Sequence, residues 1–345
     1  MAYEIREITC RDKEALLQVR SLLASEGLTV DAHLDYTCGL FDEQDTLIAT
    51  GSCFASTLRC FAVARDHQGK GLLNEVVTHL MEVQAARGNF HLFVYTKPRS
   101  ARFFESLGFS EIARLDGTLV FLENRKHGFS DYCKSLGTPG SGGAAAIVVN
   151  ANPFTLGHRY LVEQAAGQYG TVHLFVLSED RSFFPAAVRY RLVQEGTADI
   201  PGVVLHETQD YLISAATFPG YFLKGSEAAA QAGARLDAAV FARIAEALGI
   251  QARFVGDEPS STVTRLYNEV LAAELPKADI SCVIVPRLEK GGQIVSASTV
   301  RQLIHDGRLD DVCALAPPST WNYLISPDSA DVIRAIRDAD EVRHF

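Results

Sequence analysis

The 345-residue sequence has no run of 18 apolar residues, no excess of basic residues and no cysteine pair of the CxxC type. Without a long apolar run it offers no candidate for a membrane-spanning helix. A formal net charge of −10 argues against general binding to nucleic acid or anionic membranes. The seven cysteines are scattered and odd in number, which argues against a disulfide framework or a zinc site. We therefore expect no nucleic-acid partner, no membrane partner and no metal held by protein side chains alone.

The first residues, MAYEIREITCRDKEALL, carry charges where a secretion signal would be apolar. The scattered cysteines also suit reduced thiols better than disulfides. Both features predict a cytoplasmic protein.

The length exceeds what one hydrophobic core usually organises, so two domains are expected. The segment SLGTPGSGGAAA (135–146) is rich in Gly, Ser and Pro and is typical of a linker. We predict a first domain over 1–134, a linker over 135–144 and a second domain over 145–345. The C-terminal segment 327–345 is predicted to be an exposed, charged helical tail.

The second domain alternates short apolar runs with helical patterns. Runs that are apolar at consecutive positions favour strands covered on both faces, which predicts a doubly wound, Rossmann-like parallel α/β fold. The five runs are 145–149, 172–177, 203–206, 253–256 and 282–286. Ligands of such sheets bind beyond the carboxyl ends of the strands.

The stretch NANPFTLGH (150–158) lies where the first of these runs gives way to a helix. Free amides and the positive end of the helix dipole favour a phosphate at such a place. Gly157 would allow close approach, while Thr155 and His158 would add hydrogen-bond donors. The alternative is that Thr155 only caps the helix and that His158 is a surface residue.

A second helix start, QIVSASTVRQL (293–303), carries hydroxyl groups followed by an arginine. Ser296, Ser298, Thr299 and Arg301 would suit the β- and γ-phosphates of a nucleotide. Read alone, the segment could equally be a serine-rich N-cap.

The order TxGH first and SASTVR last resembles the nucleotidyltransferase superfamily with the HxGH signature, in which the α-phosphorus of a nucleotide is attacked. This resemblance implies an ATP site, with Thr155 standing where many members have their first histidine. It implies catalytic roles for Thr155, His158 and Arg301. It implies ATP-binding roles for Asn152, Pro153, Phe154, Gly157, Gly256, Asp257, Glu258, Ser296, Ser298 and Thr299. For Gly256, Asp257 and Glu258 the alternative is a turn with a helix cap.

The first domain has a glycine-rich turn before a helix in ARDHQGKGLLNEVV (64–77). With TKPRSARFFESLGF (96–109), this stretch is similar to the GNAT acetyltransferase fold, an α+β domain. Gln68 and Gly71 match the GNAT pyrophosphate-binding pattern, whereas Leu73 departs from it. The resemblance implies that Gln68, Gly69 and Gly71 bind a pantetheine or CoA-like group. The alternative is a plain glycine turn before an amphipathic helix.

A GNAT-like domain in front of a TxGH domain resembles the citrate lyase ligase (citrate lyase synthetase) family. The stretches SEDRSFFPAAVRYRLVQEGT, DYLISAATFPGYFLK and VGDEPSSTVTRLYN also look like that family. Within them, Arg189 and Arg191 could be merely solvated, and Phe218 and Tyr221 could line an acetate pocket or belong to a core.

This resemblance implies an AMP- and pyrophosphate-forming acid–thiol ligase that uses ATP with Mg²⁺. Acetate would form acetyl-adenylate, and the acetyl group would pass to the thiol of the phosphoribosyl-dephospho-CoA group on the acyl carrier subunit of citrate lyase. Two alternatives stay open from the sequence. One is a different nucleotidyltransferase with a separate GNAT acetyltransferase activity, and the other is a non-catalytic sensor of CoA or nucleotides.

Overall fold

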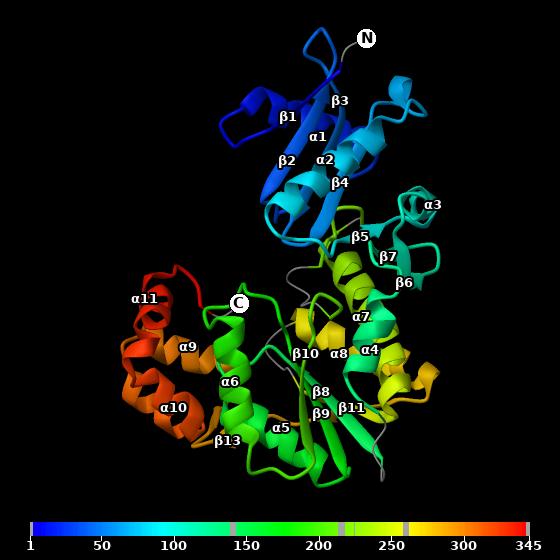
Figure 1. Cartoon of the computed structure of the whole chain (residues 1–345). Helices are drawn as coiled ribbons and strands as arrows, with labels where there is room; N and C mark the ends of the chain where they lie inside the picture. The colour runs from blue at the N-terminus through cyan, green and yellow to red at the C-terminus, as the bar shows by residue number, and fades with distance from the viewer. Residues whose placement is uncertain (1–2, 139–142, 213–217, 224, 258–261, 343–345) are drawn as a thin grey trace. The chain divides into compact units, whose positions relative to one another are not determined.

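The computed structural model describes residues 3–138, 143–212, 218–223, 225–257 and 262–342 (Figure 1). By their internal contacts, the residues form two compact units. One comprises 1–131 and 217–236, and the other 132–216 and 237–345. A stretch from the later part of the sequence therefore packs with the first unit.

The first unit is built on a seven-stranded mixed sheet with the strand order β1-β2-β3-β4-β5-β7-β6. All neighbouring strands are antiparallel except β4 and β5, which are parallel. The strands are β1 (Glu4–Glu7), β2 (Tyr36–Phe41), β3 (Leu47–Phe54), β4 (Thr57–Val63), β5 (Phe93–Thr96), β6 (Ser110–Leu115) and β7 (Leu119–Glu123). With its helices, this sheet confirms the prediction of a GNAT-like α+β fold.

Three helices accompany this sheet: α1 (Lys13–Ser25), α2 (Leu72–Ala86) and α3 (Pro98–Ser106), and α4 (Gly128–Ser135) follows β7. Helix α2 buries Leu72, Val76, Val77 and Leu80, which recur every three to four residues and so share one face. They belong to the same core as Ile48 and Ala49 of β3. Burying each large side chain contributes about 1.5–3 kcal/mol, so this face fixes α2 on the sheet.

The second unit is built on a five-stranded sheet with the order β10-β9-β8-β11-β12, and every neighbouring pair is parallel. Its strands are β8 (Ala144–Val149), β9 (Thr171–Val176), β10 (Val203–Glu207), β11 (Ile250–Gly256) and β12 (Ser281–Val285). The five apolar runs of the sequence are these five strands. The predicted doubly wound α/β fold is confirmed.

Helices alternate with these strands, as the order of the elements along the chain shows. They are α5 (Leu156–Ala166), α6 (Ala186–Thr197), α7 (Ser226–Leu248), α8 (Thr262–Glu274) and α9 (Ala297–His305). A two-stranded hairpin, β13 (Glu289–Lys290) and β14 (Gln293–Ile294), precedes α9. Helix α7 begins in the first unit and ends in the second, since the division falls after Leu236.

The C-terminal segment contains α10 (Pro318–Leu324) and α11 (Ala330–Asp338). Val332, Ile336 and Val342 are buried and belong to the core of the second unit. The prediction of an exposed tail is therefore wrong. The segment RAIRDADEVR is mostly charged, which led to the prediction of exposure. The apolar residues at 332 and 336 are spaced four apart and therefore share one helix face, which is the buried one.

No helix within the described ranges combines the length and the apolar character that crossing a lipid bilayer requires.

Candidate active site

A cavity of about 360 Å³ lies at the carboxyl edge of the parallel sheet, a volume suited to a small molecule. Residues from the ends of β8, β11 and β12 line it, together with the start of α5. The strand order reverses between β8 and β11, because β9 and β10 lie on one side and β12 on the other. Such reversal points are where open α/β sheets bind ligands.

Thr155 and His158 form a reciprocal cap at the start of α5. The Thr155 hydroxyl accepts the backbone N–H of His158 at 3.4 Å, and His158 Nδ1 accepts the backbone N–H of Thr155 at 3.1 Å. This arrangement is a capping box in which the imidazole takes the place of the usual Glu or Gln. Because Nδ1 accepts a backbone N–H, the hydrogen-bond network assigns the ring proton to Nε2.

The electrostatic surroundings keep His158 neutral. Its pKa is lowered from an ordinary value of 6.5 to about 3, chiefly by burial and then by the charges of Arg287 and Arg301. At neutral pH the ring is therefore an uncharged donor through Nε2–H. It lines the cavity and is held in place by its own helix cap.

The structure shows that Thr155 caps helix α5, which was the alternative interpretation of that residue. Its side chain is buried, and its hydroxyl also lies 3.0 Å from His158 Nδ1. Thr155 thus positions the histidine. The companion alternative, that His158 is a surface residue, does not fit a half-buried ring that lines a cavity.

Gly157 brings the two predicted helix starts together. A Cβ atom at Gly157 would lie 2.4 Å from the carbonyl oxygen of Val295, so only glycine allows this approach. The next residue, Ser296, is the N-cap of α9 and accepts the backbone N–H of Thr299 at 3.1 Å. The hydroxyls of Ser298 and Thr299 each lie 2.8 Å from that of Ser296. A cluster of hydroxyls therefore adjoins the start of α5.

Arg301 is buried and tied to two backbone carbonyls. Its Nε donates to the oxygen of Val342 at 2.7 Å, and a terminal nitrogen donates to the oxygen of Asn152 at 2.5 Å. Burial lowers its pKa to about 10, so it stays charged at neutral pH. It is not among the residues that line the cavity. Arg301 thus holds the turn before α5.

The other predicted residues of this turn are buried supports. Asn152 Oδ1 accepts the backbone N–H of Phe184 at 3.1 Å, and the Asn152–Pro153 peptide is cis. The carbonyl of Phe154 accepts the Thr320 hydroxyl at 2.7 Å, and the Phe154 ring lies parallel to that of His158. None of the three turn residues lines the cavity.

Of the predicted group after β11, Gly256 lines the cavity. The backbone N–H of Asp257 donates to Val285 at 2.8 Å, which joins the ends of β11 and β12. Glu258 lies outside the described residues.

Sequence reasoning missed a buried ion pair in the wall of the cavity. Arg253 on β11 donates to Asp237 on α7 at 2.5 Å, and both side chains are almost wholly buried. Burial and the Asp237 charge raise the pKa of the neighbouring Tyr267 phenol well above its ordinary value. Asn268 on α8 donates to the carbonyl of Gly256 at 2.9 Å. No short sequence pattern predicts these contacts.

Arg189 of α6 is fully buried, although the sequence allowed a solvated side chain. It donates to the carbonyls of Asn150 and Leu177 at 2.8 Å and of Phe184 at 3.0 Å. These bonds join the carboxyl ends of β8 and β9. Arg287, which follows β12, also lines the cavity and was not foreseen.

A second cavity, of about 720 Å³, belongs to the first unit. The parallel strands β4 and β5 pair only at Thr57–Phe93 and Leu58–Val94. The cavity is lined by residues beyond this short ladder, at the ends of the two strands and at the start of α2.

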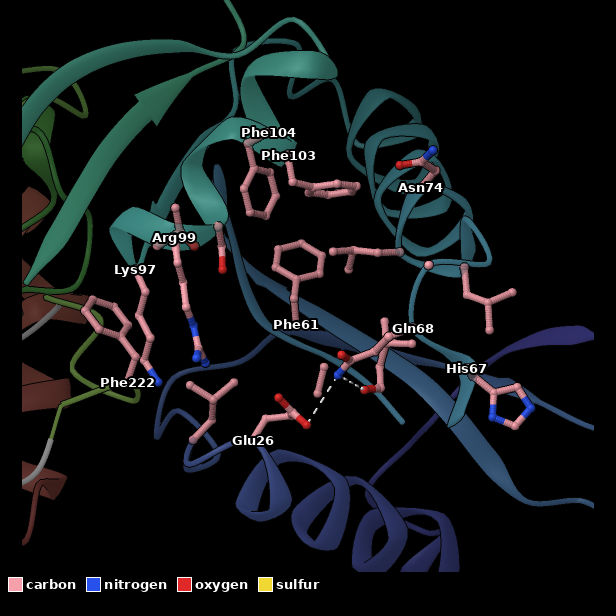
Figure 2. Close-up of a pocket in the computed structure, with 18 of the residues that line it drawn as sticks. Glu26, Phe61, His67, Gln68, Asn74, Lys97, Arg99, Phe103, Phe104 and Phe222 are labelled. Atoms are coloured by element: carbon pink, nitrogen blue, oxygen red, sulfur yellow. Dashed lines mark hydrogen bonds between the residues drawn. The ribbon is translucent and has the colours of Figure 1, made fainter. Parts of the chain in front are cut away.

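Figure 2 shows Lys97 and Arg99 reaching into this space near Phe61 and Phe222. The predicted residues Gln68, Gly69 and Gly71 all line the cavity. Gly69 and Gly71 adopt positive φ angles of 79° and 81°, which shape the turn into α2. The amide of Gln68 donates to the carbonyl of Val63 at 3.1 Å and so ties this turn to the end of β4.

Tyr221, far away in sequence, lines the same cavity. Its hydroxyl donates to the carbonyl of Tyr95 at 3.3 Å, and its own carbonyl accepts the backbone N–H of Thr29 at 2.9 Å. The Phe218 ring packs edge-on against Tyr95. Phe218 and Tyr221 therefore belong to the first unit and do not line the cavity beside His158.

Comparisons with known proteins find relatives over most of this chain. Residues 144–324 match the family model for the citrate lyase ligase C-terminal domain. The chain is 38% identical over 322 residues to the citrate (pro-3S)-lyase ligase of Klebsiella pneumoniae, covering 91% of this chain and 94% of that one. It is 36% identical over 322 residues to the enzyme of the same name from Escherichia coli K12, covering 91% of each.

Among solved structures, an acetyltransferase of the GNAT family from Staphylococcus aureus covers 36% of this chain and 99% of its own, with 16% identity and a TM-score of 0.31. The fold assignment accordingly rests on the strand order and directions of the two sheets.

Proposed function

The chain belongs to the citrate lyase ligase family, and on that premise we propose that it acetylates the prosthetic-group thiol of the citrate lyase acyl carrier subunit at the expense of ATP. AMP and pyrophosphate are the other products. The second unit makes acetyl-adenylate, and the first unit receives the thiol-bearing arm. The classification as a ligase agrees with the names of both relatives.

In the first step, a carboxylate oxygen of acetate attacks the α-phosphorus of ATP. The new bond joins that oxygen to phosphorus, and the bond to the bridging oxygen of pyrophosphate breaks. Acetate is already ionised at neutral pH, since carboxyl pKa values lie near about 4, so the step needs no base. Positioning and charge stabilisation therefore carry the catalysis.

The residues in and beside the cavity of the second unit suit these two tasks. Nε2–H of His158 donates to an oxygen of the α-phosphate, and the free amides at the start of α5 bind beside it. The hydroxyls of Ser298 and Thr299, at the adjoining start of α9, take the leaving pyrophosphate. Thr155 and Arg301 act by holding His158 and the turn at Asn152 in place.

Mg²⁺ would accompany ATP, because it is usually held by substrate phosphates and one or two carboxylates. Asp257, next to the cavity residue Gly256, would supply the carboxylate. The ion would neutralise phosphate charge.

In the second step, the thiol sulfur of the prosthetic group attacks the acetyl carbonyl carbon and gives up its proton to solvent. The carbon–sulfur bond of the thioester forms as the bond from that carbon to the phosphate oxygen of AMP breaks, and AMP leaves. The cavity of the first unit suits the arm that carries this thiol. Lys97, Arg99 and the amides of the turn at 68–71 would bind its phosphate groups, and Phe61 and Phe103 would pack against its apolar stem.

The observation that carries this proposal is His158, fixed as a neutral donor where two helix starts meet at the strand-order reversal. The test is ATP–pyrophosphate exchange across small carboxylates, followed by addition of the thiol-form carrier. Acetate should stimulate exchange, and the carrier should then be acetylated. Exchange that ignores every carboxylate would refute the proposal.

Deleting residues 1–134 would not test the two roles cleanly. Residues 217–236 pack with the first unit, so the deletion would strip that segment of its partners. Single substitutions within each cavity separate the two steps better.

A further inference from the structure

The proposed adenylation places several negative charges in the cavity of the second unit, yet Arg301, the arginine foreseen from the sequence, does not face them. Arg301 is committed to the carbonyls of Asn152 and Val342 and lies outside the lining. His158 is neutral. Arg253 does line the cavity, but Asp237 neutralises it.

Arg287 is the other arginine among the described residues that line this cavity. It lies just after β12, separated from it by Pro286, and its Nε donates to the carbonyl of Asp257 just after β11. The next residue, Leu288, accepts the backbone N–H of Val295 at 2.9 Å. Val295 is the residue whose carbonyl lies against Gly157. Arg287 is thus fixed to the same backbone frame that sets the two helix starts side by side.

The charge of Arg287 also acts on His158, since it is the largest electrostatic cause, after burial, of the low pKa of that ring. The two side chains therefore share one electrostatic environment at the start of α5. A guanidinium suits a phosphate there, because its planar fork can donate two parallel hydrogen bonds.

We propose that Arg287 binds an oxygen of the α-phosphate and, together with His158, stabilises the negative charge that develops as acetate attacks. This inference rests on the proposed function and adds a catalytic residue to it. Arg287 supplies the positive charge and His158 supplies a directed neutral donor.

The test is acetate-dependent ATP–pyrophosphate exchange by the full-length R287Q and R287K variants, with K290Q as the matched control. Lys290 is an exposed cation three residues further along the same segment and does not line the cavity. R287Q should lower the turnover number about 100-fold or more, with a KM for ATP within about threefold of the wild type. R287K, which keeps the charge but loses the fork, should fall between. K290Q should match the wild type.

Chemical rescue distinguishes a catalytic guanidinium from a structural one. Free guanidinium at tens of millimolar should raise the exchange rate of R287A about tenfold and should not raise the exchange rate of H158A. If R287Q proves less stable than the wild type, the rescue of R287A still tests the proposal, because it compares the same folded variant with and without added guanidinium. R287K then serves as the second variant.

The outcomes separate this inference from the function beneath it. Wild-type exchange together with R287Q exchange within threefold of it would overturn the role of Arg287 and leave the proposed function standing. The role of Arg287 would also be overturned if guanidinium did not rescue R287A and if the changes in its KM and turnover number accompanied a lower melting temperature. A wild type without acetate-dependent exchange would refute the proposed function itself.

Discussion

The two cavities of the molecule arise in different ways. In the second unit every strand pairs with its neighbours, and the cavity forms beyond the strand ends, where the strand order reverses. In the first unit the cavity opens within a sheet, where β4 and β5 stop pairing after two residues each. The cavity of the second unit lies beside helix starts, which carry free amides. The cavity of the first unit, in a split sheet, is larger and is lined by both charged and apolar side chains.

The difference extends to the side chains. His158 is fixed by its helix cap and is tuned by burial and neighbouring arginines. Lys97 and Arg99 of the other cavity instead stand beside aromatic rings. One cavity is therefore suited to chemistry on phosphates and the other to holding a long, partly charged arm. The predictions below change one cavity while leaving the other intact.

The largest effect should come from H158A. Loss of the Nε2–H donor should lower acetate-dependent ATP–pyrophosphate exchange about 100- to 1000-fold. The control is H305A, which removes a partly exposed histidine at the end of α9 in the same unit. An H158A exchange rate close to that of H305A would contradict the role assigned to the ring.

G157A should come next. The added methyl would lie 2.4 Å from the carbonyl of Val295, so the two helix starts must separate. We expect roughly a tenfold loss of exchange and about 1–3 kcal/mol of unfolding free energy. The matched control is G167A at the other end of α5, where the nearest atom outside the chain neighbours lies at 3.4 Å. Equal behaviour of G157A and G167A would show that the contact with Val295 is dispensable.

Acid should weaken the second unit. Burial lowers the pKa of His158 to about 3 and of His206 to about 4. Histidines of the unfolded chain take up protons below about pH 6.5, while the folded protein keeps both rings neutral. The free energy of unfolding should therefore fall as the pH drops from 6.5 towards 4, by about 1–2 kcal/mol per ring at pH 5.

Urea unfolding at pH 7 and pH 5 measures this effect. H206F should show a smaller loss between the two pH values than the wild type, and H305Q should show the same loss as the wild type. If H206F and the wild type lost the same free energy of unfolding between pH 7 and pH 5, protonation of His206 would not destabilise the folded state.

The smallest effect should come from R99E in the first unit. Arg99 is exposed and lines the cavity, so reversing its charge should raise the KM for the thiol-form carrier roughly fivefold to tenfold. Exchange without the carrier should not change. R20E, a charge reversal on the exposed face of α1, is the control. A drop in exchange in R99E would show that the two cavities do not have separate tasks.

The parts of the site that the sequence revealed are local. The caps at Thr155–His158 and Ser296–Thr299 join residues three apart, and such spacing is visible in any single sequence. The five apolar runs became five parallel strands. The three central strands β8, β9 and β11 are largely buried, because a strand covered on both faces leaves a continuous apolar signature, whereas the edge strands β10 and β12 are partly exposed.

The parts that escaped prediction depend on distant pairing. Arg301 binds a carbonyl 149 residues earlier and another 41 residues later, and Tyr221 pairs with Thr29 across 192 residues. The ion pair of Asp237 and Arg253 joins a helix to a strand. No period or cap within a short window encodes these contacts. Arg301 therefore holds the backbone through these two carbonyls, and its role in binding phosphate stays a prediction.

The most direct test of the account is a crystal structure of the full-length protein with Mg²⁺ and an ATP analogue that cannot be cleaved at the α-phosphorus. The triphosphate should lie between the starts of α5 and α9, with an α-phosphate oxygen within hydrogen-bonding distance of His158 Nε2. A triphosphate bound in the cavity of the first unit, with the two helix starts of the second unit left without it, would contradict the account.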